Sequence, residues 1–94
     1  MFLDELRTKI DEIDEEIIKK LEARFETVMA IGEYKKERRL PIVDYERELT
    51  KLEKVEELST PLFSEYNKAV FMEIIEVSKD FQSEIVGERP EDAE

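Results

Sequence analysis

The feature that most constrains this chain is an unbroken helical repeat of apolar residues over its first third. From Leu3 to about Lys36, apolar side chains recur every three or four residues, which predicts one amphipathic helix. They are Leu3, Leu6, Ile10, Ile13, Ile17, Leu21, Phe25, Val28 and Ile31. At about 1.5 Å per residue this helix is roughly 50 Å long, whereas a compact domain of this size has a radius of gyration near ~13 Å. Something else, such as a partner subunit, must therefore cover its far end.

A second, shorter helix is predicted after Pro41, because a proline clashes with the preceding helical turn and ends the first helix. Asp44 suits the cap of the new helix, with Arg47 and Glu48 in its first turn. The face expected to be buried consists of Leu49, Leu52, Val55 and Leu58.

A third helix is predicted to begin at "STP", residues 59–61, with Ser59 or Thr60 as its cap and Pro61 in its first turn. Its apolar period runs through Leu62, Tyr66, Val70, Ile74, Val77, Phe81 and Ile85. The sequence thus predicts an all-α fold of long, short and long helices in one domain, residues 1–86. Residues 87–94 are expected to form an acidic, flexible tail.

Composition narrows the possible functions. The formal net charge of −11 disfavours nucleic acid and anionic lipid as partners, since binding to phosphates relies on Lys and Arg. Histidine and cysteine are absent, so catalysis must proceed without imidazole or thiol, and we expect no metal and no cofactor. With no signal peptide and no long apolar run, we expect a cytoplasmic protein that has no membrane segment.

Polar residues interrupt the apolar rows of both long helices. Arg24 lies on the buried row of the first helix, where a charge needs an acceptor. An ion pair with one of the 26 acids would satisfy it. Ser78 and Gln82 interrupt the row of Phe71 and Ile75 in the third helix, either as a solvated edge or as a polar pair in the core.

Two further cations have positions that helical geometry relates to Arg24. Lys35 follows by about three turns, so both side chains project from the same side, roughly 16 Å apart along the axis. A solvated base within "KKERR" is the alternative for Lys35. Arg7 lies about 25 Å from Arg24 and some 100° around the helix, so it reaches the same small ligand only from an antiparallel copy of the helix. A local pair with Asp4 or Asp11 is the alternative for Arg7.

Taken together, these residues resemble the all-helical (AroQ-type) chorismate mutases, which convert chorismate to prephenate. The resemblance covers about residues 3–82. It is carried by "LRTKIDEID" with Arg7, "EAR" with Arg24, "GEYK" with Lys35, "PIVDYERE" with Asp44, Arg47 and Glu48, and "SKDFQ" with Ser78 and Gln82. It implies an interlocked homodimer whose long helices lie antiparallel, each site receiving one arginine from the other chain. It also implies the stand-alone form of the enzyme, with no regulatory domain.

The resemblance implies a role for each polar residue. Arg24 and the Arg7 of a second chain bind the side-chain carboxylate of chorismate. Arg47 and Ser78 lie toward the ring carboxylate. Lys35 and Gln82 donate to the ether oxygen. Glu48, with the backbone of Asp44, accepts from the ring hydroxyl.

Two alternatives to a mutase remain open at this point. An isochorismate pyruvate-lyase shares the fold and much of the cationic site, although the full polar set, including Glu48 and Gln82, favours the mutase. A non-catalytic helical dimerisation module is the alternative from a different functional class.

Overall fold

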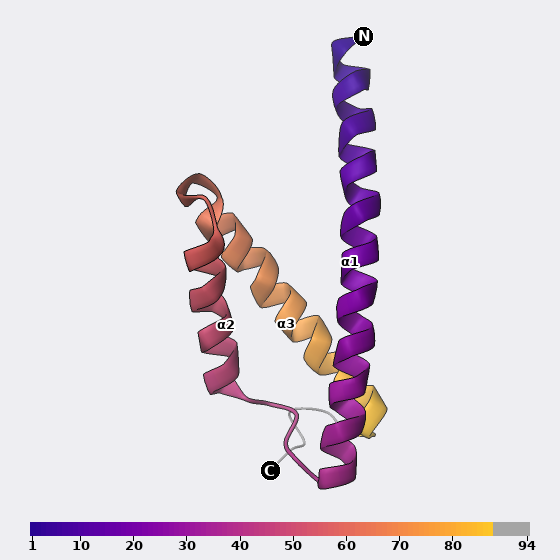
Figure 1. Cartoon of the computed structure of the whole chain (residues 1–94), viewed down its shortest axis with the longest axis vertical. Coiled ribbons are helices and arrows are strands. Elements are labelled where there is room, and N and C mark those ends of the chain that lie inside the picture. The colour runs from indigo at the N-terminus through magenta and orange to yellow at the C-terminus, as the bar shows by residue number, and fades with distance from the viewer. Residues whose placement is uncertain (88–94) are drawn as a thin grey trace.

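A computed structural model describes residues 1–87 of the chain. Within them the chain forms three α-helices and no strand: α1 (Phe2–Arg38), α2 (Tyr45–Leu58) and α3 (Ser64–Val86), with a short 3₁₀ helix, η1 (Pro61–Phe63), before α3 (Figure 1). The predicted all-α order of long, short and long helices is confirmed. The expected tail, apart from Gly87 at the end of α3, lies outside the described residues.

The ends of α1 and α2 follow from local signals. Arg39 ends α1 with a turn in the left-handed region, at φ 55°, and the chain bends again at Ile42 before α2. The predicted cap of α2 is confirmed, because the Asp44 carboxylate accepts a hydrogen bond of 3.1 Å from the backbone N–H of Arg47.

The predicted start of α3 is partly correct. Thr60 occupies the cap position of η1, which runs directly into α3, and Pro61 lies in its first turn, but neither Ser59 nor Thr60 makes a side-chain cap hydrogen bond. Ser59 lies at the end of α2, where its hydroxyl donates to the Val55 carbonyl and accepts a 2.9 Å hydrogen bond from the Asn67 amide. Its hydroxyl therefore joins the end of α2 to α3 rather than starting a helix.

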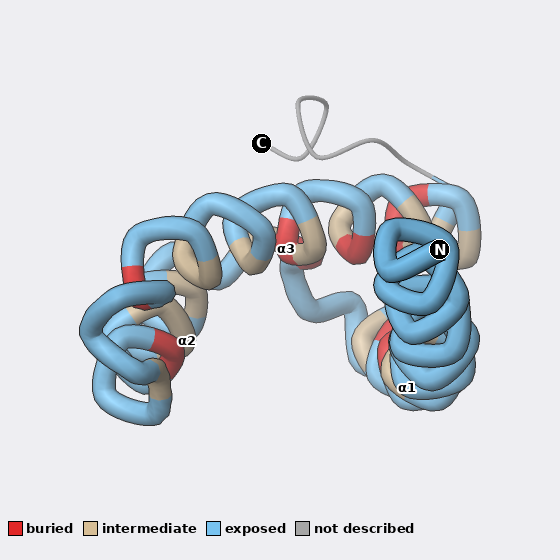
Figure 2. The backbone as a smooth tube through the Cα atoms, turned by 90° about the horizontal axis from the view of Figure 1, so that it is seen from above, coloured by how far each residue is buried: buried red, intermediate tan, exposed pale blue. Residues whose placement is uncertain are grey.

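The predicted buried face of α2 is only partly correct. Val55 is buried and Leu52 half-buried, but Leu49 and Leu58 are 60% and 74% exposed. The physical reason is that α2 packs against α3 and has little direct contact with α1, so only a narrow strip of its surface is covered. Figure 2 shows this arrangement, with α3 across the top and α1 and α2 below it on either side.

The core of the single chain is thin and unusually polar. Its buried apolar side chains are Val28, Ile42, Val55 and Ile75, and its buried polar ones are Ser64, Ser78, Gln82 and Ser83. Phe25 and Phe81 meet edge to face at 5.9 Å and help to hold α1 against α3. On α3 the buried row is thus the one that contains Ser78 and Gln82.

Much of the predicted apolar surface is uncovered. The N-terminal end of α1 extends beyond the other helices (Figure 1), and the described part of the chain measures 55 Å along its longest axis, with a radius of gyration of 16.4 Å. On the N-terminal half of α1, Leu3, Leu6, Ile10, Ile13 and Ile17 are between 43% and 57% exposed. On α3 and η1, Leu62, Tyr66, Val70 and Val77 are exposed as well. Within residues 1–87, no helix combines the length and apolar character needed to cross a membrane.

Candidate functional site

A pocket of about 370 Å³ opens between the three helices and the segment that joins α1 to α2. Its lining includes all but one of the residues expected to form a site, namely Arg24, Lys35, Asp44, Arg47, Glu48, Ser78 and Gln82. The remaining wall is apolar except for two lysines, and consists of Val28, Ile31, Ile42, Lys51, Ile75 and Lys79. The lining thus carries five cations and two acids, in a chain whose formal net charge is −11.

Arg24 crosses from α1 to α3. Its Nη1 donates a 2.6 Å hydrogen bond to the hydroxyl of Ser78, which in turn donates to the Ile74 carbonyl at 2.7 Å. Arg24 forms no ion pair with any acid of residues 1–87, so the alternative of a pairing with one of these acids is wrong. Burial and the nearby charge of Arg47 both lower the pKa of Arg24 below its usual value. An anion that enters the pocket would relieve both effects.

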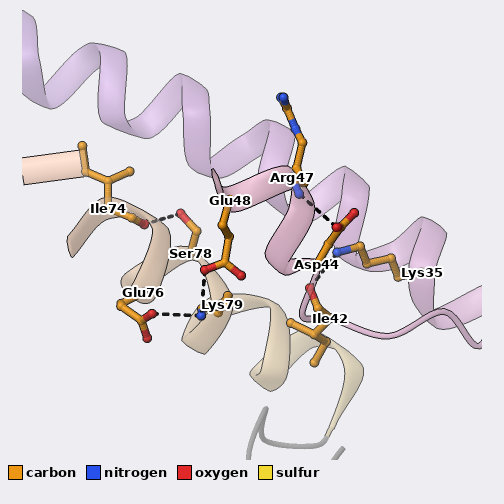
Figure 3. A network of polar contacts seen from close by, with 9 residues as sticks. All are labelled: Lys35, Ile42, Asp44, Arg47, Glu48, Ile74, Glu76, Ser78 and Lys79. Atoms are coloured by element: carbon orange, nitrogen blue, oxygen red, sulfur yellow. Dashed lines mark hydrogen bonds and ion pairs between the residues drawn. The ribbon is translucent and has the colours of Figure 1, made fainter. Parts of the chain in front are cut away.

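Lys35 also turns inward from α1, and is not the solvated base that "KKERR" allows. Its ammonium donates to the Ile42 carbonyl at 2.9 Å (Figure 3) and to the side-chain oxygen of Gln82 at 3.4 Å. Burial lowers the pKa of Lys35, and the negative charges of Asp44 and Glu48 offset this only in part.

Gln82 and Ser78 are buried side chains of α3, each 7% exposed, so a solvated edge is wrong for both. They do not form a polar pair with each other, since Ser78 bonds to Arg24 and Ile74 while the Gln82 amide nitrogen donates to the Val28 carbonyl at 3.5 Å. Gly32 lets α1 approach α3 closely here. A Cβ on Gly32 would lie 3.3 Å from Cδ1 of Ile85 and 3.6 Å from Cγ of Gln82.

The first turn of α2 forms the opposite wall. Asp44 caps the helix, and Arg47, whose backbone N–H completes the cap, extends its side chain away from that carboxylate (Figure 3). One oxygen of Glu48, Oε1, accepts a 3.1 Å bond from Lys79 on α3. The other, Oε2, is buried and has no hydrogen-bond partner among residues 1–87, so it remains free to accept one from a ligand.

Two cations of the lining, Lys51 and Lys79, were not among the residues expected from the sequence. Lys79 directly follows Ser78, but its partner Glu48 lies 31 positions earlier on another helix. No local pattern links residues so far apart. The pair of Lys79 and Glu48 could have been found by searching the predicted inner faces of α2 and α3 for opposite charges.

Arg7 is the expected site residue that the chain does not bring to the pocket. It lies on the exposed half of α1, about 25 Å along the helix from Arg24. The local alternative is also wrong, because within the described part of the chain Arg7 pairs with neither Asp4 nor Asp11. Asp4 lies 3.8 Å from the N-terminal amine instead.

The arrangement suits recognition of a small anion rather than acid–base chemistry. Forked guanidinium donors and ammonium groups face an apolar floor, which is how proteins bind carboxylates. In residues 1–87, no cluster of three or more acidic, histidine or cysteine side chains could hold a metal ion.

Comparison with known proteins adds one finding to this geometry. A family model described as chorismate mutase type II matches residues 6–83, a span that contains all eight expected site residues, from Arg7 to Gln82. No curated protein and no solved structure matched the chain.

Proposed function

The chain belongs to the chorismate mutase type II family, which implies an isomerase that acts on chorismate, and we propose that it rearranges chorismate to prephenate by binding a compact conformer and stabilising its transition state. The observation that carries this proposal is the excess of cations around the pocket. Five basic side chains and two acidic ones line it, although acids outnumber bases in the chain by 26 to 15.

The chemistry requires no group that this chain lacks. The rearrangement is a concerted shift in which a carbon–oxygen bond breaks while a carbon–carbon bond forms, without proton transfer or covalent intermediate. A protein accelerates such a step by holding the reacting atoms together and by placing donors where negative charge develops. The absence of histidine and cysteine is therefore no obstacle.

Arginines are assigned to the two carboxylates of the substrate. We assign Arg24, with the Arg7 of a second chain, to the side-chain carboxylate, and Arg47 with Ser78 to the ring carboxylate. The lowered pKa of Arg24 supports this assignment, because burial and the charge of Arg47 leave its cation in need of a counter-ion.

Lys35 and Gln82 are assigned to the ether oxygen, where electron density builds as the bond breaks. The Lys35 ammonium uses two of its three hydrogens on Ile42 and Gln82, and the Gln82 amide uses one of its two on Val28. Each side chain thus retains one N–H for the substrate. Removing one such donor typically costs a factor of about 100 to 1000 in rate.

Glu48 is assigned to the ring hydroxyl, together with the backbone of Asp44. Its buried Oε2, which has no partner within the described chain, supports this role because an isolated acceptor in a pocket is costly unless a ligand satisfies it.

A homodimer completes the proposed site. The exposed apolar row of α1 and the position of Arg7 on that same half of the helix both support an antiparallel pairing of two long helices. Such a pairing would cover the row and deliver Arg7 to the partner's pocket. In this role the protein serves the phenylalanine and tyrosine branch of aromatic amino-acid synthesis, in the cytoplasm.

The test is chorismate consumption by the wild type beside Arg24→Ala, with the molecular mass of the same samples measured by light scattering. We expect a dimer, prephenate as the product, and a loss of at least about 100-fold in kcat/KM for Arg24→Ala. Arg38→Ala is the matched control, because Arg38 stacks on Tyr34 outside the pocket.

Two results would reject the proposal. Wild-type turnover no faster than the uncatalysed reaction would favour the non-catalytic dimer. Isochorismate as the better substrate, with pyruvate released, would favour the lyase.

A further inference from the structure

Lys79 forms a largely buried ion pair with Glu48 at the edge of the pocket. Its ammonium lies 3.1 Å from Glu48 Oε1 and 2.9 Å from Glu76 Oε1 (Figure 3), with the side chains of Lys79 and Glu48 only 14% and 22% exposed. The other ion pairs in the described chain lie on more exposed side chains. Because solvent screens a pair less when it is buried, this contact fixes the carboxylate of Glu48 more firmly than a surface pair would.

The ion pair with Lys79 gives the two carboxylate oxygens of Glu48 different roles. Oε1 is committed to Lys79, while Oε2 is buried without a partner within residues 1–87. Glu48 lines the pocket, so this division leaves one acceptor for a substrate hydroxyl and sets the direction from which it is offered.

Without Lys79, Glu48 has competing partners. Lys35, Arg47 and Lys51 line the same pocket, and the charge of Glu48 already acts on Lys35, whose pKa it raises against the larger effect of burial. A carboxylate released from Lys79 would turn toward these cations. It would then neutralise groups that the substrate carboxylates need, and it would withdraw the acceptor from the hydroxyl.

We propose that Lys79 is a positioning residue, which holds Glu48 so that one oxygen accepts from the substrate hydroxyl and so that Glu48 does not pair with the substrate-binding cations. This inference rests on the proposed function of the pocket. Lys79 stays charged in this role: burial lowers its pKa, but hydrogen bonds with Glu76 and Glu48 and their negative charges outweigh that effect and raise it.

A double-mutant cycle tests the inference, because a residue that acts only through Glu48 has no effect once the Glu48 carboxylate is removed. The variants are Lys79→Met, Glu48→Gln and both together. We expect Lys79→Met to lower kcat/KM by roughly tenfold or more, and the double variant to match Glu48→Gln alone within about twofold. Lys79→Arg, which keeps the charge, should recover most of the loss.

Lys68 provides the matched control. It lies on α3 and joins Glu65 at 3.3 Å and Glu56 of α2 at 3.5 Å, so it makes the same kind of bridge between helices but outside the pocket. Lys68→Met should leave kcat/KM within about twofold of the wild type, although it also removes an ion pair between α2 and α3. An equal loss in both variants would mean that Lys79 is merely structural, and would overturn the proposal.

Crystal structures supply a readout that does not depend on turnover. In Lys79→Met, or in Lys79→Gln should the methionine variant fold poorly, the Glu48 carboxylate should move toward Lys35, Arg47 or Lys51. An unmoved carboxylate, or additive losses in the cycle, would reject the positioning role. If the wild type fails to consume chorismate while Glu48 moves as expected, the proposed function fails, and only the part of the inference that Lys79 holds Glu48 away from the other cations stands.

Discussion

Arg24 and Ser78 join the two long helices through a single hydrogen bond of 2.6 Å, in which the guanidinium donates to a hydroxyl rather than to a carboxylate. In this structure the Ser78 hydroxyl donates its proton to the Ile74 carbonyl, and its oxygen accepts from Arg24; to bind the ring carboxylate, the hydroxyl would have to turn its proton away from Ile74. A neutral partner orients the arginine without neutralising it. The charge of Arg24 is thereby kept for a ligand.

Ser78→Ala should therefore impair binding more than folding. Removal of the hydroxyl frees the Arg24 guanidinium to move, and we expect KM to rise by roughly tenfold with a smaller change in kcat. Ser83→Ala is the control, since Ser83 is also buried on α3 and donates to a carbonyl four residues earlier, but does not line the pocket. Steady-state kinetics of both variants measure this, and equal effects would contradict the assignment of Ser78.

Activity should be nearly flat from mildly acidic to mildly basic pH, because the Gln82 amide needs no proton from solvent, and should then fall at alkaline pH. The cation of Lys35 is the donating form, so activity is present below its pKa and is lost as the pH rises through it. Since burial lowers that pKa, the loss should come at lower pH than for a free lysine. A rate profile against pH measures this, and a steep loss just above pH ~6 would contradict it.

This alkaline loss should not reflect unfolding. Because the pKa of Lys35 is lowered in the folded state, the unfolded chain binds the Lys35 proton more tightly. As the pH rises from the folded-state pKa to the unfolded-state pKa, Lys35 therefore makes folding more favourable. Circular dichroism across the same pH range should therefore stay constant where activity falls. The residual activity of the Lys35→Gln variant should not fall at alkaline pH.

Mixing two inactive variants should restore activity if Arg7 acts across the dimer. Arg7→Ala and Arg24→Ala should each be inactive, but a heterodimer of the two has one site with both arginines and one with neither. Random assortment makes half of the dimers mixed, so co-refolded protein should regain roughly a quarter of wild-type activity. No gain on mixing, with mass spectrometry showing that heterodimers form, would contradict donation of Arg7.

Gly32→Ala should disturb the site more than the fold. Alanine favours a helix over glycine by up to about 1 kcal/mol, but its Cβ would lie 3.3 Å from Cδ1 of Ile85, closer than ordinary contact. Relief of this contact would shift α1 against α3 next to Gln82, whose Cγ lies 3.6 Å from the same Cβ. We expect the free energy of unfolding to change by less than about 1 kcal/mol, while kcat falls severalfold. Ile85→Val, which removes the closest methyl group, should restore kcat in the double variant; chemical denaturation and kinetics together measure both effects.

Helix boundaries were predictable where a local signal fixes them. Pro41 and Asp44 act on neighbouring backbone groups, and both ends that they define agree with the structure within two residues. "STP" marks the start of the helical segment at Thr60 and Pro61, but it provides no side-chain cap. The hydroxyl of Ser59 instead bonds to Val55 and to Asn67 eight residues on, which the tripeptide does not reveal.

Burial was harder to predict, because the spacing of apolar residues shows which of them lie on the same face of a helix but not which element covers that face. Leu49 and Leu58 fit the period of α2 and are exposed, since α3 covers only part of that face. Arg24 and Gln82 stood out because they break an apolar row. Lys79 interrupts no apolar row, so the rule that singled out Arg24 and Gln82 did not find it, and its pairing with Glu48 follows from the packing of α2 against α3.

The small direct contact between α1 and α2 has a mechanical consequence. In the single chain α3 is the main bridge between them (Figure 2). The charged residues that line the pocket nevertheless lie on both α1 and α2. A dicarboxylate bound by both Arg24 and Arg47 would link α1 to α2 directly. The subunit should therefore be more rigid when the pocket holds a ligand than when it is empty. Amide hydrogen exchange in Tyr45–Leu58 should then slow with substrate or product bound, and heat resistance should rise with their concentration.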